Sequence, residues 1–142
     1  PNDEDYQNVH MEVTAFNTKT DPTTAFGFIC AQQSEDWSFY YFAITPAGQY
    51  AIIRATTGES DVFLTKTGKW ESSDLIKHKA SSYRIGADCG NGKLTLYVDG
   101  HKIVSVSDKT YTKGRVGLFV WSGEEASSAN IRFDDFLLAS LK

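Results

Sequence analysis

The feature that most constrains this sequence is a two-residue alternation of apolar and polar side chains. It runs through Val9–Val13, Phe39–Ile44 and Leu94–Val98. Successive side chains of a β-strand point to opposite faces, so this period predicts strands with one face buried. Similar short apolar runs lie at Gln49–Arg54, Val62–Leu64, Lys102–Val106, Val116–Trp121, Ile131–Phe133 and Phe136–Leu138.

Turn signals separate these runs at short intervals. Asp99–Gly100, between Leu94–Val98 and Lys102–Val106, is typical of a two-residue hairpin turn. Apolar residues at helical spacing do not extend beyond a turn or two, and Ser72–Lys77 is the best short candidate for a helix. About ten short strands joined by turns predict an all-β chain, folded as an antiparallel sandwich or barrel.

Length, charge and composition exclude several classes of protein. The 142 residues suit one domain, 1–142, and 23% charged residues are typical of a globular protein. A net charge of −4 without a basic block argues against a nucleic-acid partner. No apolar run is long enough to span a membrane. Since the chain begins with Pro1, we expect a fragment of a longer polypeptide.

The two cysteines, Cys30 and Cys89, each end a strand-like run. They are either two buried thiols or, if their strands are neighbours, a disulfide. Such a cross-link would close a loop of about 60 residues and contribute about 4 kcal/mol. We predict the disulfide and, with it, a location outside the cytoplasm.

Five segments appear in the order found in a known family: Phe26–Ile29, Asp36–Tyr50, Leu94–Gly100, Lys113–Leu118 and Ile131–Phe136. From Val9 to Leu138 the chain resembles bacterial concanavalin A-like lectin and glucanase domains, which are related in shape to laminin G-like modules. The resemblance implies a jelly roll, an antiparallel two-sheet sandwich. It also implies an extracellular or cell-surface protein.

Domains of this family usually open with a further stretch of one or two strands before the position of Val9. Its absence here predicts an exposed sheet edge beside Val9–Val13. Three explanations stay open: the piece was trimmed or is disordered, a partner chain supplies it, or natural cleavage exposes Pro1.

The sequence contains no motif for catalysis. Glucanases on this fold carry alternate carboxylates on one strand, as nucleophile and acid. The acidic pairs here, at residues 35–36, 124–125 and 134–135, are adjacent instead, so the members of a pair on a strand would face opposite ways. The three histidines lack metal-ligand spacing, and no nucleophile elbow occurs. We therefore predict a protein that is not an enzyme.

Calcium is an alternative cofactor that the resemblance raises, since relatives hold Ca²⁺ at a sheet rim through Asp carboxylates. The candidate ligands are Asp99, Asp108, Asp134 and Asp135. Turn aspartates usually bind their own backbone instead, so no cofactor is predicted.

Aromatic residues out of phase with the core carry the functional hypothesis. In a sandwich the outer face of a sheet is normally polar, so rings there offer a surface on which sugars can stack. The predicted site combines five rings with three polar partners for hydroxyl groups: Trp37, Tyr41, Tyr97, Phe119 and Trp121, with Arg84, Asp88 and Arg132. The face on which Arg54 lies is ambiguous, because Tyr50 and Ile52, which share its side of the predicted strand, look buried.

We therefore predict a non-catalytic, extracytoplasmic module that binds carbohydrate or another surface ligand through an aromatic sheet face. One alternative is a structural or protein-interaction module completed by a strand from a partner. The other is a glycoside hydrolase, which would need two carboxylates facing one cleft.

Overall fold

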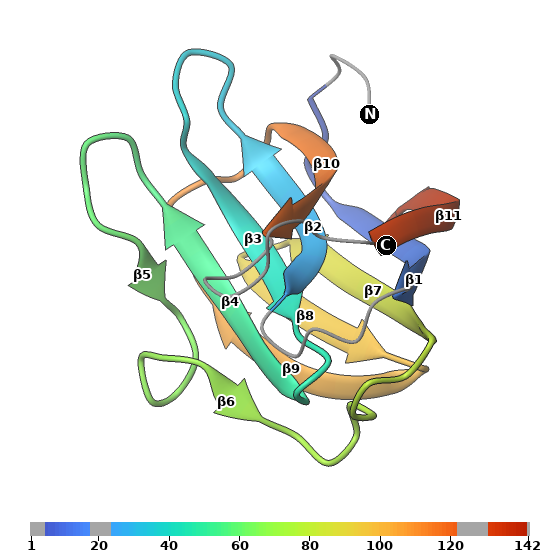
Figure 1. Ribbon diagram of the computed structural model, residues 1–142. Helices are drawn as coiled ribbons and strands as arrows, with labels where there is room; N and C mark the ends of the chain where they lie inside the picture. Colours follow the sequence, from blue (N-terminus) through green and yellow to red (C-terminus); the bar gives the residue numbers. More distant parts are fainter. Residues whose placement is uncertain (1–4, 18–23, 122–130, 142) are drawn as a thin grey trace.

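The computed structural model describes residues 5–17, 24–121 and 131–141. Two antiparallel sheets face each other (Figure 1). The first, named here the β7 sheet, has the order β11 (Ile131–Ser140), β1 (Val9–Asn17), β7 (Ser82–Gly90), β8 (Lys93–Val98) and β9 (His101–Ser107). The second, the β3 sheet, has the order β10 (Arg115–Trp121), β2 (Ala25–Gln32), β3 (Phe39–Ile44), β4 (Gln49–Ala55) and β5 (Val62–Phe63), with β6 (Glu71–Ser72) also pairing with β4.

The two-residue alternation has the predicted effect. In β1 the odd-numbered positions from Val9 to Asn17 are buried, and the even-numbered ones are partly exposed. In β3, Tyr40, Phe42 and Ile44 are fully buried between the sheets. The all-β sandwich predicted from the sequence is confirmed, because alternate side chains of both sheets fill one core.

The predicted hairpin joins β8 to β9 through Asp99 and Gly100. Both residues have positive φ angles, 51° and 84°. This is the conformation that two-residue hairpin turns require, and an aspartate followed by glycine adopts it at low cost.

The disulfide joins the two sheets. Cys30 of β2 and Cys89 of β7 are bonded, with their Cα atoms 6.6 Å apart. The two strands are not hydrogen-bonded neighbours; they belong to opposite sheets, and both cysteines face the core. The cross-link therefore fixes one layer of the sandwich to the other.

Two expectations from the sequence are wrong. Ser72–Lys77 is not a helix: Ser72 ends β6 and turns follow it, because Ser73 donates its N–H to the Gly48 carbonyl oxygen and Ile76 is buried in the core. The segment Val9–Val13 has no free edge, since β1 lies between β11 and β7. Among the described strands, β11 forms that edge of the sheet. Pro1 lies outside the described residues.

Within the ranges given above, no helix is long and apolar enough to cross a membrane.

Candidate functional site

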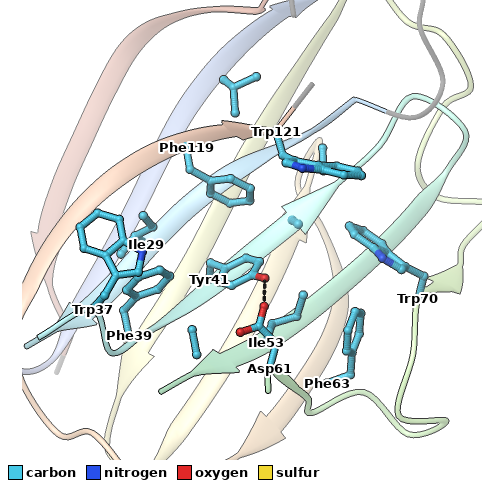
Figure 2. A pocket seen from close by; sticks show the side chains of 14 residues that line it. Ile29, Trp37, Phe39, Tyr41, Ile53, Asp61, Phe63, Trp70, Phe119 and Trp121 are labelled. Atoms are coloured by element: carbon cyan, nitrogen blue, oxygen red, sulfur yellow. Dashed lines mark hydrogen bonds between the residues drawn. The ribbon is translucent and has the colours of Figure 1, made fainter. Parts of the chain in front are cut away.

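A groove of about 680 Å³ lies on the outer face of the β3 sheet (Figure 2). Its walls are aromatic and its floor consists of small and aliphatic side chains. The lining residues are Ala25, Ile29, Trp37, Phe39, Tyr41, Ala43, Ile53, Ala55, Asp61, Phe63, Trp70, Phe119, Val120 and Trp121. All three tryptophans of the chain are among them.

Small residues on the outer face of the sheet make the floor low. Ala43 of β3 lies beside Gly27 of β2, which lies beside Phe119 of β10. A Cβ atom on Gly27 would come 1.9 Å from the Phe42 carbonyl oxygen, so only glycine lets β2 and β3 approach as they do. The rings at either side of these small residues therefore stand above the floor and enclose the groove.

Four rings form a continuous row along one side. The ring centroids of Trp37 and Phe39 are 5.5 Å apart, those of Phe39 and Tyr41 5.7 Å, and those of Tyr41 and Phe119 5.2 Å. The Trp37 and Phe119 contacts are edge-to-face, the arrangement favoured by ring quadrupoles. Each ring thus holds its neighbour in place while leaving surface open to a ligand.

Trp37 is held through its backbone rather than by burial of its ring. Its N–H donates to Thr57 Oγ1 over 2.8 Å, and the Thr57 N–H donates to Ser38 Oγ over 3.0 Å. These bonds fix the loop before β3, yet 67% of Trp37 is exposed. Trp121, across the groove, is 52% exposed. Exposed rings of this size on a fixed backbone are typical of binding surfaces.

The groove contains a carboxylate next to β5, at one edge of the sheet. The Tyr41 hydroxyl donates to Asp61 Oδ2 over 2.6 Å, and the Phe63 and Trp70 rings lie 6.1 Å apart beside it. Burial raises the pKa of Tyr41 well above its usual value, and the hydrogen bond to Asp61 raises it further. Tyr41 therefore remains neutral, and its hydroxyl proton stays in the hydrogen bond to Asp61.

The eight residues predicted to form one site lie on two opposite faces of the sandwich. Half of them line the groove: Trp37, Tyr41, Phe119 and Trp121. The other half belong to strands of the β7 sheet: Arg84, Asp88, Tyr97 and Arg132. The prediction of a single surface is wrong, because the alternation specifies inward and outward positions and does not specify the sheet.

The second half belongs to a polar network on the outer face of the β7 sheet. His10 lies between two carboxylates, with Nδ1 2.5 Å from Asp88 Oδ1 and Nε2 2.7 Å from Glu12 Oε2. The Tyr97 hydroxyl donates to Asp88 Oδ2 over 2.8 Å. Arg84 pairs with Glu12 over 3.1 Å and donates to the carbonyl oxygen of Asp135 in β11 over 2.9 Å.

This network shifts the pKa values of its members. Burial alone would lower the pKa of His10, but the hydrogen bonds and charges of Glu12 and Asp88 outweigh it and raise the pKa. The hydrogen bond from His10 and the one from Arg84 lower the pKa of Glu12. Because these polar groups hydrogen-bond to one another, the network connects β8, β7, β1 and β11 across the outer face of the sheet.

Arg132 lies apart from both the groove and the His10 network. Its guanidinium carbon is 4.5 Å from the centroid of the Phe16 ring, within the range of a cation–π contact. The two residues are paired across β1 and β11. The contact covers a ring on the outer face of the sheet.

Sequence reasoning missed several groove residues. Phe39 shares the outward face of β3 with Tyr41, and Asp61, Phe63 and Trp70 come from β5 and the loops around it. Two-residue strands show no alternation to interpret. The available signal was Trp70 itself, the one tryptophan that the site hypothesis left out.

Three of the four aspartates considered as calcium ligands have other partners for their carboxylates. Asp99 accepts the Arg84 N–H, Asp134 accepts the Asp135 N–H, and Asp108 pairs with Arg54 over 2.5 Å. In the described parts of the chain, no three His, Cys, Asp or Glu side chains are grouped to hold a metal ion. Rim calcium stays an untested alternative. Glu124 and Glu125 lie outside the described residues.

No family of known proteins and no curated protein sequence matches this chain. Solved structures do. The carbohydrate-binding module CBM66 from Bacillus subtilis aligns with a TM-score of 0.76 at 11% identity, over 96% of this chain and 78% of that one. Chicken galectin 2 aligns with a TM-score of 0.65 at 12% identity, over 96% and 95%.

An enzyme is also among the similar structures. The β-glucanase of Bacillus licheniformis aligns with a TM-score of 0.65 at 15% identity, covering 98% of this chain and 69% of that one. Identities this low establish the shape of the chain alone. The shape is the same in all three, and this chain therefore has the concanavalin A-like jelly-roll fold.

Proposed function

We propose that this chain is a non-catalytic module that binds carbohydrate in the groove on the outer face of the β3 sheet. One observation carries the proposal: all three tryptophans line one groove, and Trp37 and Trp121 are more than half exposed there. The pyranose ring has apolar C–H faces and a rim of hydroxyl groups. Flat rings with a few polar groups beside them suit such a ligand.

The similar structures support carbohydrate as the ligand class, since they include a carbohydrate-binding module and galectins. The disulfide supports a location outside the cytoplasm, where such cross-links persist. The row of rings from Trp37 to Phe119 would stack on successive faces of a glycan. Asp61 and the indole N–H groups would bind hydroxyl groups at its rim.

The enzyme alternative needs two carboxylates on one cleft. Among the described residues that line the groove, Asp61 is the one carboxylate. Glu12 and Asp88 come together on the opposite face, where His10 binds both of them. These observations favour binding over hydrolysis. A partner strand, the remaining alternative, would have to pair at an edge such as β11.

The test is a panel of neutral, amine-bearing and acidic oligosaccharides, titrated while tryptophan emission is recorded. Because every tryptophan lies in the groove, binding there should change the emission directly. Trp121→Ala should weaken binding at least fivefold, as expected when a central aromatic contact is lost.

Tyr97→Ala is the matched control, since it removes an aromatic side chain from the outer face of the other sheet. It should leave binding unchanged. A blank panel, or a Trp121→Ala variant that binds like the wild type, would contradict the proposal.

A further inference from the structure

The two ends of the groove differ in charge. Over β10, β2 and β3 the lining is uncharged, whereas Asp61 lies next to β5, at the other edge of the sheet. Among the described lining residues there is no lysine, arginine or histidine to offset this carboxylate. Any ligand that fills the groove therefore meets a single formal charge, which is negative.

Asp61 is also available to a ligand. Its Oδ2 accepts the Tyr41 hydroxyl, and it forms no ion pair with any described residue. The residue is exposed and lines the groove, so its carboxylate can be reached by a ligand. Because the proton of Tyr41 is held by Asp61, that hydroxyl cannot serve as a donor to an anionic ligand.

Aromatic rings line the same groove as this carboxylate. Figure 2 shows the Tyr41 ring next to Asp61 and joined to it by a hydrogen bond, with the Phe63, Trp70 and Trp121 rings farther along the same groove. The faces of aromatic rings carry partial negative charge and attract cations, tryptophan most strongly. A carboxylate in a groove lined by aromatic rings favours an ammonium group and disfavours a carboxylate or sulfate.

We infer that the Asp61 end of the groove is a subsite for an ammonium group, so that the glycan preferred here carries free amines, as a glucosamine polymer does. The inference rests on the proposed function and narrows its ligand class. The neutral end of the groove would stack the sugar rings. Asp61 and the rings that line the groove would select for an amine on one of them.

The experiment compares hexamers of glucosamine, N-acetylglucosamine and galacturonate, titrated at pH 6 and low salt with tryptophan emission as the readout. The first two differ in one group on each sugar, which is a free amine in glucosamine and an acetylated amine in N-acetylglucosamine. Acetylation removes the positive charge of that group. We expect the glucosamine hexamer to bind roughly two- to tenfold more tightly than its acetylated counterpart, and galacturonate most weakly.

Asp61→Asn should remove this preference, so that the glucosamine hexamer and the acetylated hexamer bind within twofold of each other. Glu59→Gln is the matched control, because it makes the same change in net charge at an exposed position that does not line the groove. It should keep the preference. Added salt should reduce the preference of the wild type.

Two failures can be told apart. If glycans bind but glucosamine shows no advantage, or if Asp61→Asn keeps that advantage, the ammonium subsite is wrong while the proposed function stands. If no glycan of any charge class changes the emission, both are wrong.

Discussion

The disulfide gives the most quantitative prediction about stability. Cys30 and Cys89 are 59 residues apart, and a cross-link over that distance lowers the entropy of the unfolded chain. In the chain-entropy model a loop of this length corresponds to about 4 kcal/mol at 25 °C. This is a large share of the ~5–15 kcal/mol that stabilises a typical domain. The melting temperature should fall by roughly 12 °C when the bond is reduced.

The assay is denaturant unfolding of the oxidised and the reduced wild type, with tryptophan emission and circular dichroism as probes. Reduction keeps the same side chains in the core, so the comparison isolates the cross-link. The oxidised protein should also show a smaller dependence of unfolding free energy on denaturant, because its unfolded state stays more compact. Cys30→Ala/Cys89→Ala is the control and should not respond to the reductant.

A loss of less than about 1 kcal/mol on reduction would refute this reasoning. It would mean that the two sheets are held in register by the core alone, and that the unfolded chain gains little freedom when the bond opens. The reasoning would also be contradicted if the unfolding free energy of the oxidised and the reduced protein depended equally on denaturant.

Two further predictions concern the sheets themselves. Because the pKa of His10 is raised in the fold, His10 stabilises the fold at pH values below its unfolded-state pKa, and this stabilisation is lost as pH rises. Because the pKa of Glu12 is lowered, Glu12 stabilises the fold at pH values above its unfolded-state pKa, and that stabilisation is lost as pH falls. Chemical unfolding across pH should therefore show His10→Gln least stable relative to wild type between about pH 5 and 6, and closest to it near pH 9. Gly27→Ala should lower stability by about 2–3 kcal/mol through the collision with the Phe42 carbonyl. Gly117→Ala, whose Cβ would meet nothing within 4 Å, should melt within ~2 °C of the wild type.

The alternation predicted most of the fold because burial in a strand has a period of two. Tyr40 and Phe42 point inward and Tyr41 points outward, as their phase requires. The same pattern cannot say to which sheet a strand belongs. Tyr41 and Tyr97 are both outward by phase, yet β3 and β8 lie in opposite sheets. Strand order depends on contacts between distant segments of the chain. A local alternation of apolar and polar residues carries no information about those contacts.

Two other parts of the structure have no local signal. Arg54 lies on the same face of β4 as the buried Tyr50 and Ile52, where a charged side chain is not expected. In the structure its guanidinium pairs with Asp108. The Asp61 end of the groove depends on the pairing of β5 with β4, in which Phe63 lies opposite Ile53. A two-residue strand is placed by its neighbour rather than by its own sequence.

The contrast between the two outer faces is the strongest argument that the groove has a function. On the β7 sheet, His10, Glu12 and Asp88 satisfy one another and present a polar surface, which is what a sandwich needs to be stable in water. On the β3 sheet the corresponding positions carry rings, and those of Trp37 and Trp121 stay largely exposed. Exposed rings contribute little to folding, since they bury little area, and they raise the risk of aggregation. The contrast between a polar face and an exposed aromatic face therefore supports the proposal that the second face binds a ligand.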